Sequence, residues 1–359
     1  MPGLFESIFD IFYLLLVISY GIKLLFIDNK SAKMLGLMGV LLGAGDSFHL
    51  IPRVMAHMTE NGMQVYVGIL SWGKLITSIT MTIFYLIYYF YYRRETNRTF
   101  KVLDATIYLL VIARIILTLM PQNKWGSAAG SLTWDIIRNI PFIIMGLLLI
   151  LLSLKESLLF KRFALLIFIS FACYVPVVLF ADTFSLVGML MIPKTASYFL
   201  IVYEGYRTYK RRFVIADIKI EAFIALIFGL AAGVFFREFT KAFEFTSYSM
   251  LSILHVHTLV LGFLFGLIIY LLLKENNFSN LQKLQIPLIL WRFGLLLTVA
   301  MMMLKGIYQI TGDGAPLFNA YAFSGIAGLG HIMLSMGIVW LSSYGIKAPR
   351  TNLYYNTKR

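Results

Sequence analysis

The segment LSILHVHTLVLGFLFG, residues 251–266, places His255 and His257 two positions apart in an otherwise apolar run. A third histidine, His331, follows Gly328 and Gly330 in the apolar segment SGIAGLGHIMLSMG. Neutral imidazole nitrogens bind haem iron and other metals, and these segments hold three of the chain's five histidines. We therefore take His255, His257 and His331 as candidate axial ligands of a non-covalent b-type haem.

The two-residue spacing limits how this site can be built. Residues i and i+2 of an α-helix lie about 200° apart around the axis, so His255 and His257 cannot hold one ion from the same helix face. A haem would need one of them and His331, with Gly328 and Gly330 leaving room for the flat macrocycle. The structural alternative is that each histidine donates a hydrogen bond to a carbonyl or hydroxyl group inside the bundle.

Other residues near these histidines bear on the same hypothesis. Gly262 and Gly266 lie on about the same helix face as His255 and would also leave room for a macrocycle. Arg237 and Lys241 are candidates to pair with haem propionates, or else belong to an ordinary interfacial rim. The HxH pair is similar to that of the haem-copper oxidase family, in which it serves two haems. No further histidine pair supplies a copper site, so we do not expect oxygen reduction.

A second group of ionisable residues lies in the apolar segments of the first two thirds of the chain. Such groups are costly in a membrane and need a partner or a wet cavity. In GAGDSFHLIPRV, Asp46, His49 and Arg53 follow i, i+3, i+7 spacing and share a helix face. The full set of candidate ligand-binding residues is Asp46, His49, Arg53, Lys74, Arg114, Asp135, Arg138, Lys194 and Tyr198.

Among these residues five basic side chains face two carboxylates, an excess of three positive charges if His49 is neutral. This excess predicts a cavity that attracts an anionic small molecule or lipid head group. Helix breaks at Pro52, Pro141 and Pro193 would suit such a transporter or receptor. The alternative is a set of ion pairs that fix the bundle, such as Asp46 with Lys194 or Asp135 with Arg114.

The first seven apolar segments also have a loose resemblance to the alkaline ceramidase and progestin-receptor-like superfamily of membrane hydrolases, carried by Asp46, Ser47 and His49. The zinc site of that superfamily needs histidines in the last helix. The seventh segment here contains none, so a catalytic zinc site lacks its ligands. A membrane hydrolase is therefore kept only as a third alternative, which would require bound zinc.

The elements that position these residues are transmembrane helices. The chain is 60% hydrophobic and 13% charged over 359 residues, and a membrane-spanning helix needs about 20 mostly apolar residues. The sequence predicts an all-α, multi-pass membrane protein whose eleven helices cover 5–27, 34–55, 65–92, 102–120, 132–154, 162–181, 185–208, 218–236, 249–273, 286–306 and 320–344.

The net charge of +14 comes from basic residues that gather in alternate loops. This positive-inside pattern places the N-terminus outside and the C-terminus, with its basic tail, in the cytoplasm. Because membrane topology explains the basic residues, we expect no nucleic-acid partner. The expected partner is the lipid bilayer. The first helix has no cleavage pattern, so we expect it to be retained. The single cysteine, Cys173, excludes an intrachain disulfide and covalent CxxCH haem attachment.

The most charged connector, YRTYKRRFVIADIKIE, divides seven helices from four and predicts a domain boundary near residue 214. The two domains are 1–213, with the cationic cluster facing outward, and 214–359, with the histidines. Residues 216–345 resemble domain of unknown function 2871, a bacterial family of four-helix membrane proteins. The resemblance implies a bacterial plasma-membrane location and no particular activity, and it is carried by Arg237, Glu238, Thr240, Lys241, His255, His257, Gly262 and His331.

Overall fold

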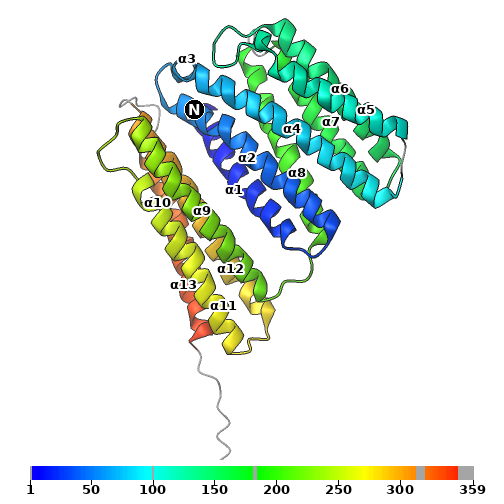
Figure 1. The fold of residues 1–359 in the computed structure, drawn as a ribbon. Coiled ribbons are helices and arrows are strands. Elements are labelled where there is room, and N and C mark those ends of the chain that lie inside the picture. The colour runs from blue at the N-terminus through cyan, green and yellow to red at the C-terminus, as the bar shows by residue number, and fades with distance from the viewer. Residues whose placement is uncertain (1, 99–100, 181–183, 313–319, 347–359) are drawn as a thin grey trace, which may run out of the picture. The chain divides into compact units, whose positions relative to one another are not determined.

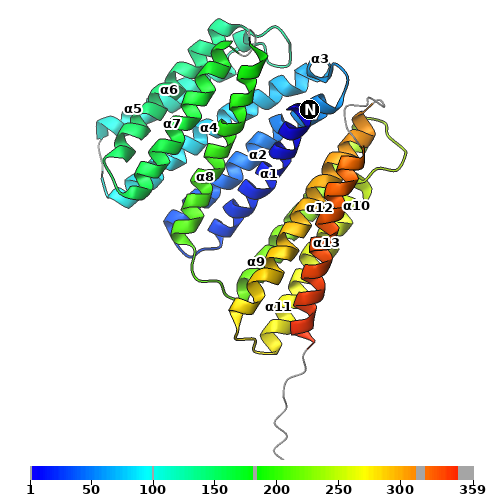
Figure 2. The same cartoon turned by 180° about the vertical axis from the view of Figure 1, so that it is seen from behind.

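The computed structural model is built from helices, in agreement with the predicted fold class (Figures 1 and 2). It describes residues 2–98, 101–180, 184–312 and 320–346, and the basic tail from Lys347 onward lies outside them. Eleven of its helices are long and apolar enough to cross a membrane, which confirms the predicted multi-pass architecture. The chain forms two compact units, one up to Arg211 and the other containing most of the chain from Arg212 onward.

The first unit, called the seven-helix unit here, contains seven of the membrane-spanning helices. In both views α1 and α2 lie side by side, and α4 follows on the other side of α2 (Figures 1 and 2). Its elements are α1 (Pro2–Leu25), α2 (Lys30–Met58), α3 (Gly62–Val65), α4 (Val67–Thr96), α5 (Lys101–Leu119), η1 (Pro121–Asn123), α6 (Leu132–Leu154), α7 (Leu158–Phe180), η2 (Ser185–Leu190) and α8 (Met191–Tyr209).

Small residues bring α1 and α2 into close contact. A Cβ atom placed on Gly21 of α1 would lie 2.8 Å from the backbone nitrogen of Val40, and one on Gly36 of α2 would lie 2.8 Å from the carbonyl oxygen of Gly21. Only glycine fits at these positions, because the two backbones themselves are in contact. The pairing aligns the polar residues of the two antiparallel helices along their length.

The core of the seven-helix unit is unusually rich in tyrosine. Five tyrosines of α4 are almost completely buried among aliphatic and phenylalanine side chains from the neighbouring helices. A buried tyrosine needs a partner for its hydroxyl group, so these rings carry polar atoms deep into the bundle. The five are Tyr85, Tyr88, Tyr89, Tyr91 and Tyr92.

The predicted helix breaks at Pro52 and Pro141 are wrong, because α2 and α6 continue through these residues. Near Pro193 the span does change, from the 3-10 helix η2 to α8, and Pro193 lies in the first turn of α8. Pro52 leaves the carbonyl group of Phe48 without its usual donor. The backbone of Gly73 in α4 approaches this carbonyl so closely that a Cβ atom there would lie 2.3 Å from the oxygen.

The four-helix unit contains α9 (Ala216–Ala242), α10 (Leu251–His257), η3 (Thr258–Leu264), α11 (Phe265–Glu275), η4 (Leu281–Leu284), α12 (Gln285–Thr311) and α13 (Ala320–Gly345). Helix α10, η3 and α11 form one span, of which η3 is a π-helix. The indole N–H of Trp291 in α12 donates a 2.9 Å hydrogen bond to the carbonyl oxygen of Leu261 inside η3. The π-helix thus begins directly after the HVH motif and is tied to α12.

Candidate functional site

His257 and His331 meet in the four-helix unit. Their ring centroids are 6.2 Å apart and their planes are at 80°. His257 ends α10 immediately before the π-helix, and His331 lies in the middle of α13, so two helices each contribute one imidazole. The side chain of His331 is exposed on the surface of the unit and that of His257 is half-buried.

Both rings are oriented by their own helix. The Nδ1 atom of His257 is 3.1 Å from the carbonyl oxygen of Ile253, and Nδ1 of His331 is 2.8 Å from that of Ala327. A carbonyl oxygen can only accept, so each Nδ1 carries the proton and donates it. In this tautomer Nε2 keeps its lone pair. Metal-ligating histidines adopt it when their Nδ1–H group donates to a carbonyl oxygen.

His255 points to another side of the span and does not join this pair. Its ring stacks on Phe236 of α9, with centroids 6.4 Å apart, and a Cβ atom placed on Gly233 would lie 3.8 Å from the His255 side chain. Its Nδ1 atom is buried without a hydrogen-bond partner. The structure therefore separates the two histidines of the HVH motif, leaving His255 against α9 and His257 against α13.

The glycines near the histidines differ in the space they leave. A Cβ atom on Gly328 would meet nothing within 4 Å, whereas one on Gly330 would lie 2.8 Å from the hydroxyl oxygen of Thr298. Gly262 and Gly266 also pack tightly, against Ala225 and against Ala222 and Trp291, respectively. The expectation of open space beside Gly330, Gly262 and Gly266 is therefore wrong, because neighbouring helices fill it.

Arg237 lies on the surface near the end of α9. Its side chain is 82% exposed and its Nε atom is 3.7 Å from a carboxylate oxygen of Glu238. Arg237 was expected either to pair with a haem propionate or to belong to an interfacial rim, and this arrangement matches the rim. Across residues 2–98, 101–180, 184–312 and 320–346, no three side chains of the His, Cys, Asp or Glu type gather as a metal site.

In the seven-helix unit, α1 contributes acidic residues that face Arg53. Glu6 forms ion pairs with Arg53 and with His57, where Nε2 is 3.1 Å from the carboxylate. Asp10, one turn further along α1, is only 4% exposed and has one oxygen without a hydrogen-bond partner. These carboxylates were missed by the sequence analysis, although the i, i+4, i+7 spacing of Glu6, Asp10 and Tyr13 marks one face of the helix.

Asp46 accepts a 2.6 Å hydrogen bond from the hydroxyl group of Tyr13. Lys194 interacts with Asp46 electrostatically without forming an ion pair, and its ammonium group lies 4.7 Å from the ring centroid of Tyr174. The proposed pairing of Asp46 with Lys194 is therefore replaced by a bond to Tyr13. Tyr198 is buried beside them, with its hydroxyl oxygen 3.5 Å from that of Tyr85.

Arg138 and Arg114 form a separate group. Arg138 pairs with Asp135 at 2.8 Å and donates a 2.8 Å hydrogen bond to the side-chain oxygen of Asn123, whereas Arg114 donates to the backbone carbonyl of Arg138. The expected pair of Asp135 with Arg114 is wrong. Asp135 and Arg138 are three positions apart on one helix, so their side chains are neighbours on the same helix face. Arg114 lies 5.1 Å from the ring centroid of Phe142.

The remaining candidates do not complete a cationic cavity. Lys74 is exposed, and His49 is half-buried with an unpartnered Nδ1 atom. With Glu6 and Asp10 included, the four other basic side chains of the set are matched by four carboxylates. The three excess positive charges that predicted an anion site are thus offset, because α1 supplies two negative charges and Lys74 faces outward.

The chain was also compared with known proteins. No curated protein and no solved structure matches it significantly. Residues 216–347, which contain His255, His257 and His331 and nearly all of the four-helix unit, match the family model "Protein of unknown function (DUF2871)".

Proposed function

We propose that the four-helix unit binds a b-type haem through the Nε2 atoms of His257 and His331. The observation that carries the proposal is the ring separation of 6.2 Å. Two metal–nitrogen bonds of about 2.0 Å, plus the distance from each nitrogen to its own ring centre, come to about this separation. The pair thus has the spacing of two imidazoles on opposite sides of one metal ion.

The chemistry and surroundings of the pair also support haem. Each Nδ1 atom is engaged by a backbone carbonyl, which leaves Nε2 of both rings as the available ligand. His257 from α10 and His331 from α13 would hold the iron, each through its Nε2 atom. The open space at Gly328, three residues before His331, suits the edge of a flat macrocycle.

Two protein ligands would decide the kind of chemistry. A haem held by two histidines would supply one-electron transfer or haem sensing rather than oxygen chemistry. His255 would be a packing residue against Phe236. We further propose that the protein resides in the bacterial plasma membrane with its C-terminus in the cytoplasm, and that its domain boundary lies near residue 214.

The proposal is tested on the full-length protein purified from haem-replete cells. The wild-type protein should show a Soret band and the low-spin spectrum of a bis-histidine haem. His257→Ala and His331→Ala should each abolish this spectrum, whereas His255→Ala and His49→Ala should retain it as matched controls. The proposal fails if the wild-type protein contains no haem, or if His255→Ala loses the haem while His257→Ala keeps it.

A further inference from the structure

A series of buried carboxyl and hydroxyl groups, called the polar chain here, crosses the seven-helix unit. It begins at the ion pair of Glu6 and Arg53, whose side chains are 15% and 17% exposed. Asp10 follows one turn along α1, and Tyr13 follows a further turn on the same face, bonded to Asp46 of α2. The antiparallel pairing of α1 and α2 therefore sets out successive acidic groups from the unit's surface toward its interior.

Asp10 is the group in the polar chain whose surroundings most clearly favour binding a proton. It is 96% buried, and its Oδ2 atom has no hydrogen-bond partner. The charged groups that act on it are Arg53 and Asp46 of α2 and Glu6 of its own helix. A buried carboxylate oxygen without a partner is costly, and binding a proton removes that cost. Asp10 is thus placed to accept a proton.

The chain continues through hydroxyl groups on α8 and α4. Tyr198 of α8 interacts electrostatically with Asp46, and its hydroxyl oxygen is 3.5 Å from that of Tyr85. Tyr85 and Tyr88 lie three residues apart on one face of α4, and they interact electrostatically. The hydroxyl groups of Tyr85 and Tyr88 are bonded to Tyr198 and Ser153 rather than to each other, so proton transfer between them requires a bridging water molecule.

The last steps reach the opposite end of α4. The hydroxyl oxygen of Tyr88 is 2.7 Å from that of Ser153, and the rings of Tyr88 and Tyr91 are 6.3 Å apart. The hydroxyl oxygen of Tyr91 is 3.1 Å from that of Tyr209. Tyr209 in turn interacts with Glu95. All of these α4 tyrosines are buried, so the groups are shielded from lipid.

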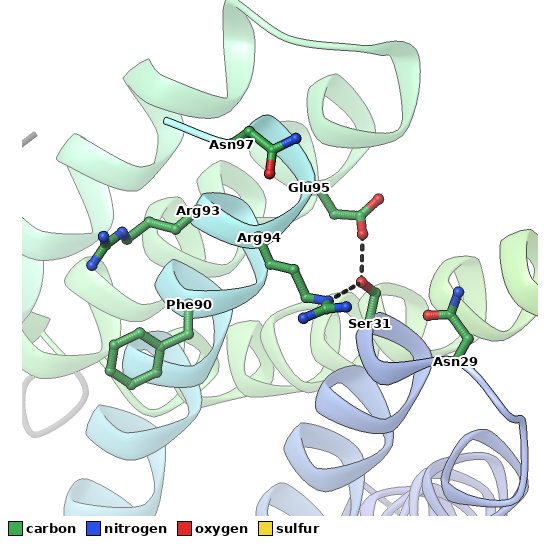
Figure 3. Close-up of a pocket in the computed structure, with 7 residues that line it drawn as sticks. All are labelled: Asn29, Ser31, Phe90, Arg93, Arg94, Glu95 and Asn97. Atoms are coloured by element: carbon green, nitrogen blue, oxygen red, sulfur yellow. Dashed lines mark hydrogen bonds between the residues drawn. The ribbon is translucent and has the colours of Figure 1, made fainter. Parts of the chain in front are cut away.

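The polar chain ends at an open cavity beside the C-terminal end of α4 (Figure 3). Glu95 accepts a hydrogen bond from Ser31 there, and Arg94 contacts the same hydroxyl oxygen at 3.2 Å. Figure 3 shows Arg94 and Glu95 of α4 both directed toward Ser31 at the start of α2. Glu95 is exposed, so a proton that reaches it can pass to solvent.

The polar chain is about as long as the hydrocarbon core of a membrane is thick. Ser31 at one end and Arg53 at the other lie on α2, and at 1.5 Å per residue they are about 33 Å apart. The hydrocarbon core of a bilayer is about 30 Å thick. The two ends of the polar chain are therefore about as far apart as the two faces of the hydrocarbon core. The balance of carboxylates and basic groups along it also leaves no net positive charge to repel a proton.

We propose that the seven-helix unit conducts protons along this chain from Glu6 and Asp10 to Glu95. At each step a hydroxyl or carboxyl oxygen accepts a proton from the preceding group and releases its own to the next. The only bonds that form and break are O–H bonds, and each event moves one proton across the membrane. Ionisable groups that form such relays through membrane helices are characteristic of pumps and transporters.

The full-length protein is tested in liposomes that contain a pH-sensitive dye. A potassium gradient with valinomycin sets an inside-negative potential, and inward proton flow is read as acidification. Wild-type vesicles should acidify faster than protein-free vesicles. Asp10→Asn and Tyr85→Phe should both reduce the rate to that of protein-free vesicles, because each removes one proton-carrying oxygen from the chain while preserving its shape.

Tyr89→Phe is the matched control. Tyr89 also lies on α4 and is 1% exposed, but its hydroxyl group donates a 2.5 Å hydrogen bond to Asp104, which is not part of the polar chain. It should retain the wild-type rate, with correct folding of every variant verified by gel filtration. Wild-type vesicles no faster than protein-free ones would overturn the proposal, as would Tyr85→Phe at the wild-type rate or Tyr89→Phe at the protein-free rate.

Discussion

The guanidinium carbon of Arg138 lies 4.5 Å from the ring centroid of Trp125, while two of its nitrogens are bonded to Asp135 and Asn123. Asn123 in turn donates hydrogen bonds to carbonyl groups at the end of α5, including that of Leu117 at 2.8 Å. A single buried arginine thus fastens the loop after α5 to the first turns of α6.

Arg138→Lys should lower the free energy of unfolding by about 2 kcal/mol. Lysine cannot stack on Trp125 and bond in two directions with one planar group, so a cation–π contact and a charge-assisted hydrogen bond are lost. The measurement is thermal unfolding in detergent. Arg237→Lys, at an exposed position, is the control and should leave the midpoint unchanged. Equal shifts for the two variants would contradict the prediction.

Tyr13→Phe should destabilise the protein by about 1–3 kcal/mol. The substitution removes the donor of the 2.6 Å hydrogen bond and leaves a carboxylate oxygen of Asp46 buried without it. Chemical unfolding followed by tryptophan fluorescence measures the change. Tyr248→Phe removes a hydroxyl group at an exposed position and should have no effect. A Tyr13→Phe protein as stable as the wild type would show that Asp46 does not need this partner.

Gly73→Ala should cost about 1–3 kcal/mol of stability by overpacking. The new methyl group would lie 2.3 Å from the carbonyl oxygen of Phe48 and 2.7 Å from the Cα atom of His49, and the backbone of α2 cannot move without disturbing the unit. Gly188→Ala is the matched control, since a Cβ atom there meets nothing within 4 Å. The two variants are compared by their thermal midpoints, and similar midpoints would refute the close contact.

Trp291→Phe should loosen the π-helix that follows His257. The indole hydrogen bond to Leu261 is lost, at a cost of about 1 kcal/mol, while most of the aromatic packing remains. Hydrogen exchange measured by mass spectrometry should become faster for residues 258–264. Residues 218–229 in α9 serve as the internal reference and should exchange at the wild-type rate. Unchanged exchange in η3 would mean that Trp291 does not hold it.

The eleven membrane-spanning helices could be predicted from the sequence because their signal is local. A run of about 20 apolar residues has one stable form in a bilayer, a helix that satisfies its own backbone groups. Helix Leu132–Leu154, for example, was predicted with these same ends. The helical angle likewise separates His255 from His257 without any tertiary information.

The pairings were decided by tertiary structure. The sequence marked His257, His331, Asp46 and Arg138 as costly in a membrane, but not the groups that would satisfy them. The partner of Asp46 is Tyr13, 33 residues away, and that of Arg53 is Glu6, because the glycine contacts of α1 and α2 fix their register. Proline was misleading for a related reason: in a packed bundle neighbouring helices compensate for one missing hydrogen bond, so α2 and α6 remain continuous. The sequence therefore determined which groups lie in the membrane, and packing determined which of them meet.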